Sequence, residues 1–408
     1  MQTKIDEKLL ENYHVREAEK ILRACVHCGF CTATCPTYRL LGDELDSPRG
    51  RIYLIKQVLE GSEISRKTQT HLDRCLTCRS CESTCPSGVR YSQLLNTGRD
   101  IVNARVERPV LQKLQYTALR KLFLNRTLFT LLLKTGQVFR PLLPSAVKNS
   151  IPESERRIGF VKRPLEKKVL LVGGCVQPAL KPNIDTAARI VLDRLGIECI
   201  EPPASCCGSL SHHLDATDEA LGIIRNNIDT WLPLIEQHGI EHICMTASGC
   251  GVAIREYREL LADDPAYADR AARISAMYRD PGEVVAQVVG QDEGLLDLLS
   301  LNIDTDRHIA FHPPCTLQHG MQNKNLIEPI LQRCGFTLQP IADSHLCCGS
   351  AGTYSITQKS LSQQLLRNKL GNIEKSRAEM IVTANIGCQL HLQSGTGTPV
   401  KHWLELFI

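Results

Sequence analysis

Short apolar runs separated by longer amphipathic stretches fill the second half of the chain. Each run is only four or five residues long, and most are followed by a segment whose apolar residues recur at helical spacing. Strands that alternate with helices in this way are typical of a parallel sheet. We therefore expect strands at residues 169–172, 197–201, 242–246, 308–312, 336–340 and 380–384.

The first hundred residues lack this alternation and have a helical pattern instead. We expect a charged helix over residues 6–24. A second helix is expected over residues 51–60, after the turn-forming stretch Ser47-Pro48-Arg49-Gly50. Together with the strands further on, this pattern predicts an α+β and α/β multidomain protein.

Residues 105–165 form a third kind of region, which is basic and amphipathic. Its apolar positions 111, 114, 118, 122, 129 and 133 roughly follow a helical stripe. From Arg105 to Lys168 there are 15 Lys and Arg against four Glu, an excess of +11 in a chain of net charge +4. The remainder of the chain therefore carries 4 − 11 = −7. Such a helical linker packs on its own protein, docks on a partner or lies on an anionic membrane.

Composition narrows the class of protein. A chain of 408 residues has room for two or three domains, and 23% charged with 43% hydrophobic residues is ordinary for a soluble protein. The N-terminus has no apolar h-region and no stretch of about 18 apolar residues occurs, so we expect neither a signal peptide nor a spanning helix. Aromatic residues are only 5% and no binding motif is present, which argues against nucleic acid.

Nineteen cysteines are far more than such a chain needs for packing, and eight of them form two identical runs. Both runs read C-x2-C-x2-C-x3-C-P, the spacing found where two [4Fe–4S] clusters share crossed ligands. In that arrangement three cysteines of one run bind a cluster with the fourth cysteine of the other run. The expected ligands are Cys25, Cys28, Cys31 and Cys85 for the first cluster, and Cys75, Cys78, Cys81 and Cys35 for the second.

Zinc and disulfides are the alternatives for these cysteines. Structural zinc sites use two separated pairs of ligands, whereas each run here spaces three thiols evenly and repeats the pattern. Disulfides are disfavoured for a chain without a leader in a reducing compartment. Two iron–sulfur clusters in one small module indicate that the protein moves electrons.

The second half of the chain is an internal repeat built around cysteine. In each half a strand leads to a cysteine, a Cys-Cys-Gly (CCG) turn follows, and a later strand leads to Gly-Cys. The matching cysteines lie 140 residues apart for Cys175 and Cys315, 141 for Cys207 and Cys348, and 138 for Cys250 and Cys388. Ligand sites of parallel sheets lie beyond the carboxyl ends of the strands. We therefore expect two groups of thiols, namely Cys175, Cys206, Cys207 and Cys250, and Cys315, Cys347, Cys348 and Cys388.

These groups are candidates for a metal or cluster site or for redox exchange; the alternative is that small residues fit tight turns. Cys199, Cys244 and Cys334 have no counterpart across the repeat and are expected to be buried small hydrophobes. The chain thus divides into a two-cluster ferredoxin-type domain (1–104), the basic linker (105–165), and first and second CCG domains (166–300 and 301–408).

The combination resembles the iron–sulfur subunits of flavin-dependent dehydrogenases, and within them those of glycolate oxidase. The resemblance rests on ILRACVHCGFCTATCPTY, GDELDSPRGRIYLIKQVLEG, HLDRCLTCRSCESTCPSGVRY, TASGCG, SHLCCGSAGTY and MIVTANIGCQ. It implies an electron-transfer subunit with no catalytic residue of its own. Flavoprotein subunits carrying FAD or FMN would oxidise glycolate, and this chain would pass the electrons toward a quinone. It also implies a cytoplasmic protein, peripheral on the inner membrane.

One departure concerns a third cluster in a CCG domain. In the heterodisulfide reductase branch the motif ends in C-x2-C, but here Ala253 follows Cys250 and His391 follows Cys388 at that position. Nitrogen replaces sulfur on iron in Rieske centres, so His391 is a candidate ligand beside the cysteines of its half. His312, His345, His212 and His213 lie near the cysteines in sequence and are further candidates for a redox role.

Three other functions stay open on the sequence. One is the same role in a related glycerol-3-phosphate or lactate dehydrogenase. Another is a heterodisulfide-reductase-like thiol–disulfide catalyst that works through the CCG cysteines, and a third is a zinc-stabilised interaction module. No G-x-G-x-x-G nucleotide fingerprint and no P-loop is present, which favours a chain that carries electrons without a flavin of its own.

Overall fold

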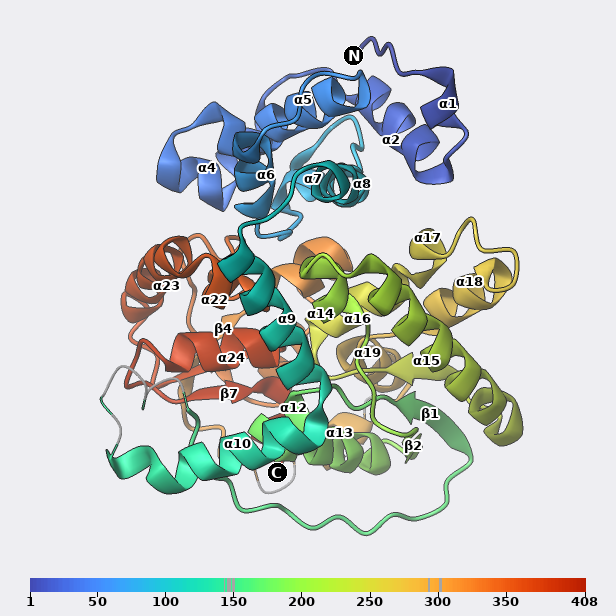
Figure 1. Ribbon diagram of the computed structural model, residues 1–408. Helices are drawn as coiled ribbons and strands as arrows, with labels where there is room; N and C mark the ends of the chain where they lie inside the picture. Colours follow the sequence, from blue (N-terminus) through green and yellow to red (C-terminus); the bar gives the residue numbers. More distant parts are fainter. Residues whose placement is uncertain (143, 145–147, 149–150, 293, 301–302) are drawn as a thin grey trace.

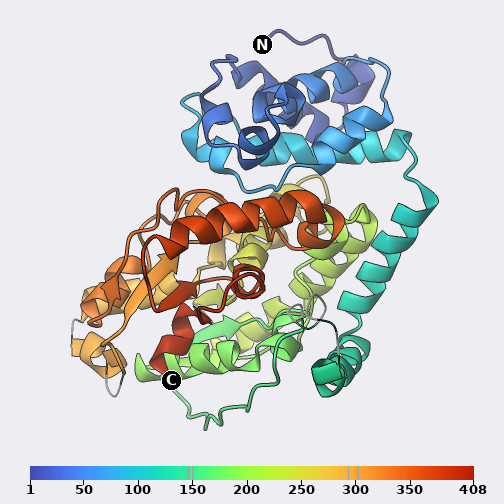
Figure 2. The same cartoon turned by 90° about the vertical axis from the view of Figure 1, so that its left-hand side faces the viewer.

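The computed structural model describes residues 1–408 except 143, 145–147, 149–150, 293 and 301–302. A helical cap lies over a body of two α/β halves, and a long helix of the linker runs from the cap down one side of the body (Figure 1). The view turned by 90° shows the same arrangement, with the cap separate above the body and the linker along its edge (Figure 2).

The cap holds the two cysteine runs. Its helices are α1 (Glu7–Leu10), α2 (Tyr13–Ala24), α3 (Phe30–Ala33), α4 (Pro36–Leu41), α5 (Pro48–Leu59), α6 (Arg66–Asp73), α7 (Ser80–Thr84) and α8 (Tyr91–Arg105), with a 3-10 turn at Glu44–Asp46. The single helix expected over residues 6–24 is wrong. The Asn12 side chain accepts hydrogen bonds from the backbone N–H groups of His14 and Val15, which caps α2 and separates it from α1.

The helix between the two runs begins earlier than expected, at Pro48. Ser47 Oγ accepts a hydrogen bond from Gly50 N at 2.9 Å, and Pro48 fits the first helical position. A Cβ on Gly50 would lie 2.0 Å from the carbonyl oxygen of Glu44. Only glycine fits there, so the stretch Ser47–Gly50 fixes how closely α5 approaches the preceding 3-10 turn.

The linker forms two helices, α9 (Val110–Leu124) and α10 (Arg126–Phe139), separated where Asn125 caps α10. Tyr116 and Phe129 are buried, but much of the apolar stripe is not. The large exposed apolar side chains of the two helices are Val110, Leu111, Leu114, Leu128, Leu131, Leu132, Val138 and Phe139.

The first half of the body has a three-stranded parallel sheet in the order β2-β1-β3. The strands are β1 (Lys167–Leu171), β2 (Ile197–Ile200) and β3 (His242–Cys244). The helices are α12 (Gln177–Leu180), α13 (Pro182–Arg194), α14 (Ser209–His213), α15 (Thr217–His238), α16 (Ser248–Arg255), α17 (Tyr257–Leu260), α18 (Ala268–Met277), α19 (Pro281–Gln291) and α20 (Gly294–Ser300).

The second half has a four-stranded parallel sheet in the order β5-β4-β6-β7. The strands are β4 (His308–His312), β5 (Thr337–Leu338), β6 (Met380–Thr383) and β7 (Val400–His402). Between and after them lie a π-helical turn (Thr316–Gly320), α21 (Glu328–Arg333), α22 (Tyr354–Thr357), α23 (Lys359–Glu374), α24 (Ile386–Gln393) and a 3-10 turn (Trp403–Phe407). The alternating pattern therefore predicted the parallel fold, although β5 is shorter than expected and β7 was not expected.

One hydrophobic core joins the two halves. Buried residues of both sheets belong to the same contiguous cluster, which includes Leu170 of β1 and Val382 of β6. The C-terminal turn crosses to the first half, where Arg194 donates to the carbonyl oxygen of Phe407 at 2.9 Å. The repeat thus folds as a fused pair with both sets of CCG cysteines in one body.

Candidate metal centres

The first cluster site (Cys25, Cys28, Cys31 and Cys85) surrounds one cavity of the cap. Cys25 follows α2, Cys31 lies in α3, and Cys85 follows α7, so the fourth thiol comes from the other run. Cys81 also reaches the wall of this cavity.

The second cluster site (Cys75, Cys78, Cys81 and Cys35) surrounds a second cavity. Cys35 precedes α4 and comes from the first run, just as Cys85 of the second run completes the first cluster site. The structure therefore brings together the two sets of four cysteines that the spacing predicts.

The two runs wrap their cavities with the same backbone conformation. His27 and Gly29 have positive φ in the first run, and Thr77 and Arg79 have positive φ at the matching positions of the second. Non-glycine residues rarely adopt this conformation, and it persists where the surrounding structure demands it. Here it turns the chain so that three thiols at i, i+3 and i+6 face one point.

The electrostatics of the thiols fit a positively charged group in each cavity. Burial, together with the neighbouring thiolates of Cys25, Cys28 and Cys85, raises the pKa of Cys31 to about 11. Burial likewise raises the pKa of Cys78 and Cys81 well above the ordinary value. Four crowded thiolates are unfavourable without a metal, and metal binding is what deprotonates such ligands. The donors present therefore suit iron–sulfur clusters.

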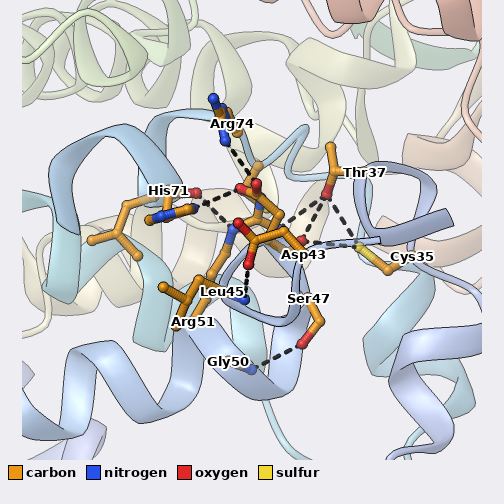
Figure 3. Close-up of polar contacts among 12 residues, drawn as sticks. Cys35, Thr37, Asp43, Leu45, Ser47, Gly50, Arg51, His71 and Arg74 are labelled. Carbon is orange, nitrogen blue, oxygen red and sulfur yellow. Dashed lines mark hydrogen bonds and ion pairs between the residues drawn. The ribbon is translucent and has the colours of Figure 1, made fainter. Parts of the chain in front are cut away.

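A buried charge network supports the second cluster site (Figure 3). Arg51 and Asp46 are both 0% exposed, and Arg51 Nη2 donates to Asp46 Oδ1 at 3.1 Å. Arg51 Nη1 donates to Thr37 Oγ1 at 3.1 Å, and Thr37 Oγ1 lies 3.3 Å from Cys35 Sγ. Burial alone would lower the pKa of Arg51, but the negative groups around it, Cys75 and Cys35 among them, raise it.

The remaining partners of Asp46 are cationic or protonatable. Arg74 Nη1 donates to Asp46 Oδ2 at 2.8 Å, and His71 Nδ1 lies 3.1 Å from Oδ1. Asp43, Asp46 and His71 also have ligand atoms within 4.8 Å of one another. Because two guanidinium groups already neutralise Asp46, this group is an ion-pair network and a poor metal site.

Sequence reasoning missed this network. The stretch GDELDSPRGRI was associated with the resemblance, but no role was assigned to its charged residues. The sequence feature that could have indicated this ion pair is the placement of Asp46 and Arg51, five residues apart, on either side of the Ser47-Pro48 helix start.

The first CCG site (Cys175, Cys206, Cys207 and Cys250) is a row of thiols in contact. Hydrogen bonds from Cys175 and Cys207 lower the pKa of Cys206, and the same contacts raise the pKa of both donors. Gly208 N also donates to Cys206 Sγ at 3.4 Å. Of these four thiols, Cys206 is the one whose surroundings favour the thiolate form.

The second CCG site (Cys315, Cys347, Cys348 and Cys388) lies next to the second cluster site. Cys315 Sγ is 3.8 Å from Cys347 Sγ, and Gly349 N donates to Cys347 Sγ at 3.4 Å. Burial and then the nearby Cys315 raise the pKa of Cys78, which is a predicted ligand of the second cluster. Leu76 and Cys78 of the cap share a buried hydrophobic cluster with Cys347 and Tyr354.

The histidines divide differently from the prediction. His391 Nε2 lies 3.2 Å from Ser362 Oγ, and the structure does not group it with the sulfurs. His312 takes that place, since a ring nitrogen lies within 4.8 Å of the Cys348 and Cys388 sulfurs. The carbonyl oxygen of His345 lies 2.9 Å from His319 Nε2, and His319 Nδ1 lies 2.7 Å from Ser83 Oγ of the cap.

His212 and His213 lie at the end of α14, with their rings 6.0 Å apart. Cys199, Cys244 and Cys334 are buried in the shared core, as expected of residues without a counterpart in the repeat.

The cap is held on the body by polar contacts on either side of these sites. Arg79 pairs with Glu256, and Tyr354 Oη donates to the carbonyl oxygen of Arg74 at 3.1 Å. Asn103 Nδ2 donates to Asp215 Oδ1 at 2.7 Å. Among the helices that the structure describes, none is long and apolar enough to cross a membrane.

Comparisons with known proteins find two kinds of domain in the chain. A profile for the 4Fe-4S dicluster domain matches residues 21–89, and a profile for a cysteine-rich domain matches residues 169–255 and 309–393. A hypothetical protein from Helicobacter pylori of known structure has a TM-score of 0.53 at 10% identity, over 96% of this chain and 71% of that one, which indicates a shared fold.

Relatives cover the whole chain. The glycolate oxidase iron-sulfur subunit of Escherichia coli K12 is 50% identical over 100% of this chain and 98% of that protein. The probable glycolate oxidase iron-sulfur subunit of Bacillus subtilis 168 is 30% identical over 97% and 94%. Lactate utilization protein A of an Exiguobacterium strain is 27% identical over 57% of this chain and 93% of its own length. The chain therefore belongs to the family of glycolate oxidase iron–sulfur subunits.

Proposed function

We propose that this chain carries electrons through two [4Fe–4S] clusters, from a flavoprotein partner that oxidises glycolate toward a quinone. The observation that carries the proposal is the pair of cavities, each lined by the first three cysteines of one run and the fourth of the other, with Cys81 reaching both. The names of the full-length relatives support glycolate as the substrate of the partner.

The ligands would be Cys25, Cys28, Cys31 and Cys85 for the first cluster, and Cys75, Cys78, Cys81 and Cys35 for the second. A bound cluster supplies one-electron redox chemistry, and its potential depends on net charge, hydrogen bonds to sulfur and solvent exposure. No side chain of the chain is assigned a catalytic role.

We infer that electrons enter at the first cluster site and pass to the second. The surroundings of the two sites support this order. Cys28 is exposed, and the side chains of Val26 and Phe30 beside it are 67% and 62% exposed. The first cluster site therefore offers an apolar surface where a partner can approach. The second cluster site is enclosed between cap and body, with Cys35, Cys78 and Cys81 buried.

The basic linker supports a second contact. Its exposed leucines on α9 and α10 and its excess of positive charge suit a flavoprotein partner or an anionic membrane surface. We infer that the chain is cytoplasmic and peripheral at the inner membrane, and that FAD or FMN belongs to the partner subunits.

Two narrower points belong to the same proposal. The relay as proposed uses two clusters, and a third cluster on the thiols of either CCG site remains a prediction that iron counting tests. A thiol–disulfide catalyst is disfavoured, because the side chains of Cys347 and Cys348 are only 4% and 1% exposed.

The test is anaerobic purification of the chain with its native partners, followed by iron, sulfide, flavin and glycolate-oxidation measurements. We expect about eight iron and eight sulfide per chain for two cubanes, flavin on the partner alone, and cluster reduction when glycolate is added to the complex. A colourless chain without sulfide would exclude an electron relay. Clusters that glycolate fails to reduce would exclude the substrate but leave the relay intact.

A further inference from the structure

The second CCG domain contains a buried histidine that the relay does not use. His312 is the last residue of β4 and is 1% exposed, and both of its ring nitrogens are buried without a hydrogen-bond partner in the described structure. Buried polar groups are nearly always paired, because leaving one unpaired is costly. A buried histidine with two unpaired ring nitrogens indicates a missing ligand that would bond to one of them.

Two sulfurs face the same point. The ligand atoms of His312, Cys348 and Cys388 all lie within 4.8 Å of one another, and all three residues are buried. They come from three elements, namely the end of β4, the CCG turn before α22, and the first turn of α24. In the sheet His312 is the register partner of Thr383, whose hydroxyl is also buried without a partner.

We propose that His312, Cys348 and Cys388 bind a single zinc ion. Imidazole nitrogen and cysteine thiolate are the ligands that zinc prefers, at about 2.0–2.1 Å and 2.3 Å. Around one tetrahedral ion such ligand atoms lie roughly 3.5–3.8 Å apart, so only a small contraction separates the observed group from a bound one. Cys347, whose side chain contacts that of Cys348, is the source of the fourth ligand.

The spacing favours one ion over a further cubane. A cubane binds each cysteine to a different iron and therefore holds the sulfurs apart. Accordingly, none of the eight cysteines of the two cluster sites belongs to a group of three such ligand atoms within 4.8 Å in the described residues. The second CCG site contains such a group, and His312 is part of it.

The first CCG site lacks the same feature. The repeat offset of 140 residues places Val172 at the position of His312, and Val172 is buried in the shared core. The described residues of that half contain no comparable group of ligand atoms. The zinc site is therefore a property of the second half alone.

A buried cation balances the charge of the site. Lys369 is 3% exposed, donates from Nζ to the carbonyl oxygen of Asp343 at 2.7 Å, and interacts electrostatically with Cys347, Cys348 and Cys388. Three thiolates around a divalent ion carry a net charge of 2 − 3 = −1, which one ammonium group offsets.

Zinc does not change its oxidation state, and a closed site of this kind is structural. It would fix the end of β4, the CCG turn and α24 beneath the contact between Cys347 and the cap. The second CCG domain would then be the rigid seat of the second cluster site.

Metal analysis of the whole chain, purified anaerobically after growth with added zinc, tests the proposal. We expect one zinc per chain beside the cluster iron, and a zinc absorption-edge spectrum with nitrogen and sulfur neighbours. His312→Ala should lose the zinc while iron content and cluster spin-resonance signals are retained. His391→Ala is the matched control, since His391 is a buried histidine of the same domain, and it should keep the zinc.

His312→Cys covers the case in which the alanine variant fails to fold. It should keep the zinc, with the nitrogen neighbour replaced by sulfur in the spectrum. Zinc that persists in His312→Ala, a spectrum unchanged in His312→Cys, or a wild-type chain without zinc would each overturn the proposal. So would extra iron and sulfide that depend on His312. Loss of the relay alone would leave the zinc measurement unaffected, so the two proposals fail separately.

Discussion

The two cluster sites are built from the same eleven-residue pattern and the same left-handed turns, yet they lie in opposite surroundings. The first is at the surface, with exposed Cys28 and Phe30 beside it. The second is enclosed against the body, with Arg51 and Asp46 completely buried beside it. The motif therefore determines which atoms bind, whereas the residues outside the motif determine charge, access and hydrogen bonding, on which the potential depends.

Crossed ligation is the part of this comparison that a single substitution can break. Cys35→Ser, although its residue lies in the first run, should remove the second cluster and about four iron atoms. Cys85→Ser should remove the first cluster instead. Iron analysis and spin-resonance spectra of both variants measure this, and loss of the first signal in Cys35→Ser would show that each run binds its own cluster.

The buried arginine should have the next largest effect. Arg51→Met removes an ion-pair partner of the buried Asp46 carboxylate. Breaking a buried ion pair lowers the unfolding free energy by about 3–5 kcal/mol. Losing a positive charge near Cys35 and Cys75 should also move the second cluster to a more negative potential. Anaerobic denaturant unfolding and a redox titration measure the two effects.

Arg49→Met is the matched control for Arg51→Met. Arg49 lies two residues away and pairs with Glu44 at 2.7 Å, but both side chains are more than a third exposed. An exposed pair of this kind contributes about 0–1 kcal/mol. Equal losses of stability in the two variants would remove the distinction between the sites.

A single hydrogen bond to sulfur gives a smaller and cleaner test. Tyr91 Oη donates to Cys75 Sγ at 3.7 Å, and the ring is buried. Tyr91→Phe should lower the potential of the second cluster only, at a cost of about 1 kcal/mol in stability. Redox titration of both clusters in one sample provides the internal reference, and Tyr53→Phe, at an exposed tyrosine of α5, should change neither.

A substitution at the exposed first cluster site should have the smallest effect on the stability of the chain. Phe30→Ser should change the unfolding free energy by no more than about 0.5 kcal/mol, as surface substitutions do. It should nevertheless slow electron transfer from the partner, because Phe30 lies beside the first cluster site. Ile356→Ser, an exposed apolar residue of α22, is the control. Equal rates in the two variants would place the partner elsewhere.

The cysteine spacing and the repeat were readable in the sequence because both depend on local order along the chain. The spacing C-x2-C-x2-C-x3-C specifies a cluster-binding loop, and matching offsets disclose a duplicated fold. The break at Asn12 was readable in principle as a helix cap, but the charged pattern continues across it.

Other features depend on contacts that no local pattern discloses. The core shared by the two halves, the pairing of Arg51 with the carbonyl oxygen of His71 at 2.7 Å, and the choice of His312 over His391 all need the folded chain. His391 has the sequence position of the expected ligand, but helix α24 directs its ring to Ser362.

The apolar contact of Leu76 and Cys78 with Cys347 and Tyr354 has a mechanical consequence. A redox module on a flexible tether can swing between donor and acceptor, but this one is anchored by its own cluster loop. The electron donor and the electron acceptor must therefore both bind close to this fixed module. We expect the rate of turnover to depend on how these partners assemble around it.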